Sequence, residues 1–65
     1  MNNELNNLRN QWMMLATGEH AETCKKAWRA VDVPDIEDEN LCEIKYVQSL
    51  IIVARQLIIS DEVTA

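Results

Sequence analysis

The chain has 65 residues, 48% of them hydrophobic, with one glycine, one proline and a formal net charge of −5. This composition is too apolar and too poor in helix-breaking residues for a disordered segment, and the length allows one small domain of marginal stability. The net negative charge repels phosphate at long range, which argues against nucleic acid as the main partner.

The charge is unevenly distributed along the chain. Residues 1–31 contain four Lys or Arg against three acids, a balance of +1, and residues 32–65 contain two against eight, a balance of −6. A basic protein surface is therefore the expected partner of the second half. The start, Met1-Asn2-Asn3-Glu4, lacks the basic and apolar regions of a secretory signal, and the two cysteines are not clustered. We therefore expect a cytoplasmic protein.

The first segment has one apolar stripe with the spacing of a helix. Leu5, Leu8, Trp12 and Leu15 follow one another at intervals of three, four and three residues. This spacing predicts a helix over residues 3–16. Gly18, the only glycine, could end that helix in a left-handed conformation or could be tolerated inside a longer helix.

The second segment repeats the same spacing at Ala21, Cys24, Trp28 and Val31. Its stripe begins six residues after Leu15 and does not continue the first stripe in phase. The spacing predicts a helix over residues 19–31. A bend near Gly18 is the simplest explanation, and both a broken arm and one long bent helix remain open.

A boundary follows at Val33-Pro34-Asp35, because proline disfavours helical geometry in the preceding residue and suits the first turn of a helix. We predict a turn at residues 32–35 and a third helix over residues 36–60, with acids in its first turn. The apolar run at residues 49–59 is too short to span a bilayer. Its β-branched residues would also suit a strand at 50–54, but an isolated strand has nothing to pair with.

The expected fold is all-α, a helical hairpin whose first arm is either one bent helix or broken near Gly18 to give three helices. A tight turn at 32–35 would make the two arms antiparallel. Four pairs would then lie level, namely Trp12 with Ala54, Leu15 with Ile51, Leu8 with Ile58, and Cys24 with Cys42. Trp12 against Ala54 is the large-against-small pairing that close packing favours.

The third helix carries more apolar surface than one partner helix can cover. A broad arc, flanked by Tyr46 and Val53, consists of Ile44, Val47, Leu50, Ile51, Ala54, Leu57 and Ile58. A second, thinner stripe of Leu41, Ile52 and Ile59 falls among polar residues on the opposite side. We therefore predict a homodimer or a stable complex with a different protein, with self-association through these three residues. The alternative is a monomer whose bent first arm covers more of the third helix.

Few residues suggest catalysis or metal binding. His20 and Cys24 are spaced four apart, and Cys42 could approach them across the hairpin, but the paired elements of zinc modules are missing. The alternative is that both cysteines are small buried hydrophobes. A disulfide between them would be unexpected in a reducing compartment. With no phosphate loop and no nucleophile beside a base, we expect no enzyme, cofactor or metal.

Two charged groups are candidates for interaction surfaces. The acidic candidate consists of Asp35, Glu37, Asp38, Glu39 and Glu43, whose alternative role is to cap and solubilise a helix. The basic candidate, Lys25, Lys26 and Arg29 beside Trp28, would suit DNA contact. Its alternative is modest pairing with acids across the hairpin.

In its size, its acidity, its five asparagines among the first ten residues and its all-helical pattern, the chain resembles short accessory proteins of temperate, lambda-like phages, including those of the region between the exonuclease and excisionase genes. The resemblance covers the general character of the whole chain. It implies a nonessential regulator that binds a host protein. We therefore expect a non-enzymatic protein–protein interaction module acting on a host or phage protein in the host cytoplasm, with a small DNA-binding regulator or an acidic mimic of nucleic acid as alternatives.

Overall fold

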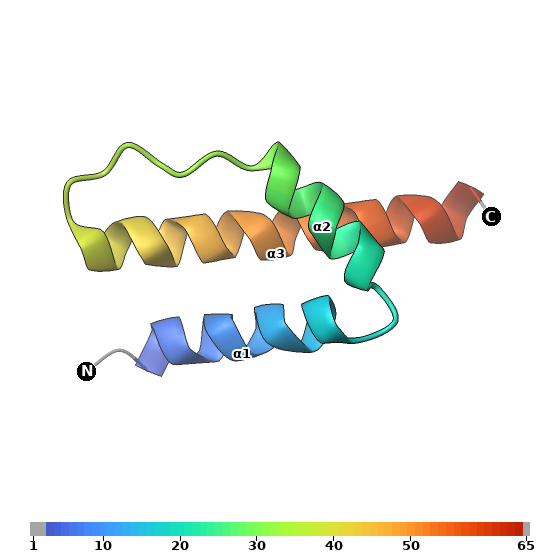
Figure 1. Ribbon diagram of the computed structural model, residues 1–65, viewed down its shortest axis with the longest axis horizontal. Coiled ribbons are helices and arrows are strands. Elements are labelled where there is room, and N and C mark those ends of the chain that lie inside the picture. Colours follow the sequence, from blue (N-terminus) through green and yellow to red (C-terminus); the bar gives the residue numbers. More distant parts are fainter. Residues whose placement is uncertain (1–2, 65) are drawn as a thin grey trace.

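The computed structural model describes residues 3–64 and consists of three packed α-helices (Figure 1). These are α1 (Asn3–Thr17), α2 (Ala21–Ala30) and α3 (Glu39–Thr64), and the described residues contain no strand. The all-α prediction is confirmed, and the helix bounds lie within a few residues of those predicted. Residues 50–54, for which a strand was the alternative, lie inside α3.

The first arm of the expected hairpin is broken into two helices at residues 18–20. The side chain of Thr17 donates a hydrogen bond to the carbonyl of Met13 at 2.6 Å in the last turn of α1, and the amide of Ala21 donates to the carbonyl of Gly18 at 3.3 Å. Gly18 does not have a positive φ. The break therefore does not use the left-handed cap that a glycine permits.

The direction of α1 relative to α3 differs from the prediction. Glu4 accepts a hydrogen bond from Gln48 at 3.5 Å, and Gln11 accepts one from Arg55 at 3.2 Å, so both pairs are 44 positions apart. Figure 1 shows that α1 and α3 run in the same direction, and these two equal separations agree with that parallel arrangement. The antiparallel hairpin is therefore wrong for this segment, because the chain reverses at residues 18–20.

The expected contacts of α1 change accordingly. Leu8 lines a groove with Ile51 and Ile52, which lie well before the predicted partner Ile58. Leu15 packs against the cluster of Cys24, Ala27 and Ala54. Trp12 also packs against that cluster, which contains its predicted partner Ala54 together with Cys24 and Ala27 of α2.

Residues 31–38 form an extended linker between α2 and α3 in place of the tight turn expected at 32–35. Eight extended residues can cover about 26 Å. The linker runs back along α3, and α2 crosses the middle of that helix (Figure 1). Cys24 consequently packs with Ala54, and Cys42 donates a hydrogen bond from its thiol to the carbonyl of Pro34 at 3.3 Å.

The hydrophobic core lies where the three helices meet. Cys24, Ala27 and Ala54 are almost completely buried, and their small side chains let α2 approach α3 closely. The surrounding side chains are Trp12, Leu15, Ala16, Val53 and Leu57. The arc predicted for the third helix is confirmed at its centre, where the buried residues are Val47, Leu50, Ile51 and Ala54.

Asp38 caps the start of α3. Its side-chain oxygen accepts a hydrogen bond from the amide of Leu41 at 3.1 Å, and its carbonyl accepts the amide of Cys42 at 2.8 Å. This geometry is that of an N-cap. We expect Asp38→Ala to lower the free energy of unfolding by about 1 kcal/mol in urea denaturation. The matched change Asp35→Ala, in the linker, should alter it by less than about 0.5 kcal/mol. Equal effects would contradict the capping role.

Candidate interaction surfaces

One side of α3 is left uncovered by the rest of the chain. Gln48 and Arg55 contact α1 on one flank of the helix, while Cys42 and Tyr46 contact the linker and α2 on the other. The side between these flanks is exposed. We call it the outer face of α3, and it consists of Leu41, Lys45, Ile52, Gln56, Ile59 and Val63.

The outer face carries large apolar side chains in contact with solvent. The exposed fraction is 44% for Leu41, 56% for Ile52, 58% for Ile59 and 79% for Val63. The first three are the residues that the sequence leaves outside the main apolar arc. Val63 was missed because the predicted helix ended at residue 60, although it lies four residues after Ile59 and therefore on the same face.

The C-terminal end of α3 extends beyond the other two helices (Figure 1). Residues 59–63 are all exposed. Ile59 and Val63 therefore lie on a segment whose apolar side chains are largely in contact with solvent. Lys45 is also exposed and forms no ion pair with any described residue.

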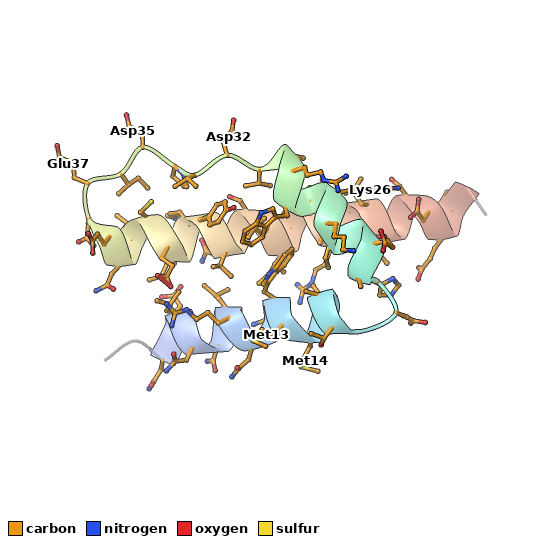
Figure 2. All side chains as sticks on the ribbon, viewed as in Figure 1. Met13, Met14, Lys26, Asp32, Asp35 and Glu37 are labelled. Atoms are coloured by element: carbon orange, nitrogen blue, oxygen red, sulfur yellow. The ribbon has the colours of Figure 1, made fainter. Side chains whose placement is uncertain are left out.

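A second apolar region surrounds three aromatic rings. Trp12 and Trp28 stack with their ring centroids 6.3 Å apart, and Trp28 meets Tyr46 edge-on at 6.0 Å. Trp28 is nevertheless 56% exposed, although its spacing placed it on a core stripe. A groove beside this stack is lined by Trp12, Ala16, Ala21, Cys24, Lys25 and Trp28. The exposed side chains of Met13 and Met14 lie on α1 (Figure 2).

The residues considered for a metal site do not come together. Within residues 3–64, no group of three His, Cys, Asp or Glu side chains is arranged to hold a metal ion. His20 lies beside Glu19 at 3.5 Å, Cys24 is in the core, and Cys42 lies against the linker. Both cysteines are free thiols. The Cys24–Cys42 pair expected to lie level is therefore not formed.

Burial raises the pKa of the Cys24 thiol, because the core disfavours the charged thiolate. The thiol is thus neutral at neutral pH and is a poor nucleophile. The unfolded chain loses this proton at a lower pH than the folded chain. The contribution of Cys24 to stability is therefore full below the ordinary thiol pKa and falls as the pH rises above it.

The acidic candidate residues have different structural roles. Asp38 caps α3, and Glu43 forms an ion pair with Arg9 of α1. Asp35 and Glu37 extend from the linker away from α3, as does Asp32, which was not among the candidate residues (Figure 2). Glu39 is exposed in the first turn of α3. The three linker carboxylates, Asp32, Asp35 and Glu37, form no ion pair with a described residue.

The basic candidate residues lie on the exposed side of α2. Lys25 pairs with Glu22 of the same helix at 3.3 Å, and not with an acid across the hairpin as its alternative role required. Lys26 and Arg29 are exposed and make no ion pair with another residue in the described part of the chain. Glu22 reduces the positive charge that this side could offer to phosphate.

Comparison with known proteins finds no family model, no curated protein and no solved structure that matches this chain. No helix in residues 3–64 combines the length and the apolar character needed to cross a bilayer. The arrangement of the described residues thus offers two kinds of contact. One is apolar, on the outer face of α3 and beside the exposed ring of Trp28, and the other is acidic, on the linker.

Proposed function

We propose that this chain is a non-enzymatic protein–protein interaction module that self-associates and binds a second, basic protein. The observation that carries the proposal is the exposure of Leu41, Ile52 and Ile59 along one side of α3. Burying a large aliphatic side chain contributes roughly 1.5 to 3 kcal/mol, so covering this face would favour association. The outer face of α3 is accordingly the self-association surface.

The linker supplies the contact to the other partner. Asp32, Asp35 and Glu37 extend outward from one short extended segment, so they can approach a basic surface together. Such charges raise the rate of association and select the partner, while affinity comes from a few desolvated side chains. The resemblance to phage accessory proteins supports a host or phage protein as this partner, in the host cytoplasm.

The test compares the proteins captured by three tagged forms of the chain. The linker variant carries Asp32→Asn, Asp35→Asn and Glu37→Gln, and it keeps Asp38 because that residue caps α3. We expect this variant to lose the partner that the parent captures, by about tenfold or more at low salt. The control variant carries Lys26→Gln and Arg29→Gln on α2 and should capture the partner as the parent does.

Two outcomes would contradict the proposal. If the linker variant and the parent capture the same proteins in the same amounts, the linker is not the contact surface. If instead the α2 variant alone loses a nucleic acid, the chain is a small DNA-binding regulator. If the linker variant loses a captured DNA-binding protein, and if DNA displaces that protein from the parent chain, the chain is an acidic mimic of nucleic acid, which is the remaining alternative.

A further inference from the structure

We infer that a second copy of this chain covers the outer face of α3 with its own α3 in the antiparallel direction, around a two-fold axis at Ile52. The inference rests on the proposed self-association and specifies its geometry. Leu41 and Val63 each lie eleven residues from Ile52, which is about three helical turns. All three are exposed on the same side of the helix.

The spacing of the apolar residues suits this axis. With the axis at Ile52, Leu41 of one copy lies level with Val63 of the other, and the two Ile52 side chains meet at the centre. The same operation places Ile59 against the aliphatic stem of Lys45. A two-fold axis makes the Leu41–Val63 and Ile59–Lys45 contacts twice and the Ile52–Ile52 contact once, so the apolar side chains at both ends of the face are covered. The overlap includes residues 41–63, about 33 Å of helix.

The charges on the outer face decide between the two directions. A parallel, in-register pair would place Lys45 beside Lys45 of the other copy, and two like charges in one contact are destabilising. The antiparallel pair instead places Lys45 near the last turns of the second α3. The partial negative charge of a helix C-terminus is confined to its last turn, and the long side chain of Lys45, level with Ile59, can extend about one turn toward it. Glu62 adds a carboxylate to that end and forms no ion pair with another described residue.

The shape of the chain agrees with the same direction. The C-terminal end of α3 extends beyond α1 and α2, and the apolar side chains of Ile59 and Val63 there are exposed. In the antiparallel pair this end lies over the first half of the second α3, where Leu41 and Lys45 are exposed. Both uncovered regions are therefore covered by one contact between identical surfaces.

The test is a distance between two identical spin labels in the assembled protein. The native cysteines are replaced by Cys24→Ala and Cys42→Ala, and one label is attached through Val63→Cys. The antiparallel pair separates the two labelled backbone positions by about 34 Å, because 22 residues of helix lie between their levels. A parallel, in-register pair brings them to about 10 Å. A second label, attached through Glu39→Cys, should give about 40 Å in the antiparallel pair and about 10 to 20 Å in the parallel pair.

The outcomes separate the orientation from the proposed function. Long distances at both positions support the antiparallel pair. Short distances at both overturn it and leave self-association intact. If the Val63→Cys protein no longer assembles while the parent does, the Glu39→Cys distance decides, because Glu39 lies away from the outer face. A parent that sediments as a monomer at every concentration overturns both this inference and the self-association on which it rests.

Discussion

Leu50→Ala is expected to lower the free energy of unfolding by about 2 to 5 kcal/mol. Leu50 is 1% exposed and has the largest fully buried side chain in the described residues, so truncation leaves a cavity in the core. A domain of this length has a total stability on the order of 3 to 10 kcal/mol. We therefore expect a large shift of the urea midpoint, followed by circular dichroism.

The matched control makes the same chemical change at an exposed position of the same helix. Leu41→Ala should change the stability by less than about 0.5 kcal/mol when measured at a concentration where the chain is monomeric. At higher concentrations the loss should grow, because Leu41 then becomes part of the contact between copies. If Leu41→Ala were as damaging as Leu50→Ala in the monomer, the arrangement of α3 described above would be wrong.

Ile52→Gln combined with Ile59→Gln is expected to convert the self-associated protein into a soluble monomer. In the proposed pair, the axis at Ile52 would bury four isoleucine side chains, two from each copy, and each would contribute roughly 1.5 to 3 kcal/mol. The loss of that burial should weaken association by more than about a hundredfold. Sedimentation velocity should show the monomer at concentrations where the parent forms dimers, while circular dichroism shows unchanged helix content.

The control for this variant is Met13→Gln combined with Met14→Gln. These methionines are also exposed, at 59% and 77%, but they lie on α1 and not on the outer face of α3. The control removes a similar apolar area and should leave the dimer intact. Dissociation of both variants would show that exposed apolar area in general, and not the outer face, causes association.

The sequence was sufficient to predict the helical segments and the buried arc of α3, but not the exposure of Trp28 on α2. Apolar side chains that recur every three or four residues lie on one face of a helix, and that face packs against the core. This recurrence is seen at Leu5, Leu8 and Trp12, and in the apolar arc around Leu50. The same spacing separates Ile52 and Ile59 from that arc. The exposure of these two side chains could therefore be predicted from the sequence, because it depends only on their positions around one helix.

The arrangement of the helices could not be predicted in this way. A stripe of apolar residues is the same whether its helix runs parallel or antiparallel to its partner, so Trp12 against Ala54 fits either direction. The position of α2 depends on whether residues 31–38 turn tightly or remain extended. Because the linker is extended, Cys24 packs with Ala54 and not at the predicted level of Cys42. The two positions differ by twelve residues, or about 18 Å along α3.

The roles of individual acids also depend on tertiary contacts. Asp38 and Glu37 are neighbours of similar chemistry, yet one caps α3 and the other points outward from the linker. Glu43 is paired with Arg9, which is 34 positions away in the chain. No local pattern distinguishes these three residues. The acidic candidates could be located on the second half of the chain but could not be divided into structural and exposed groups.

Sedimentation equilibrium of the unmodified chain tests directly whether the outer face of α3 is a surface for self-association. Sedimentation equilibrium should be recorded over a concentration range from about 1 μM to 1 mM, which corresponds to association free energies of about 8 to 4 kcal/mol. We predict that the average mass rises from that of one 7.5 kDa chain to that of two and then stays constant. A mass that remains at one chain throughout would contradict the assignment of the outer face of α3 as a surface for self-association.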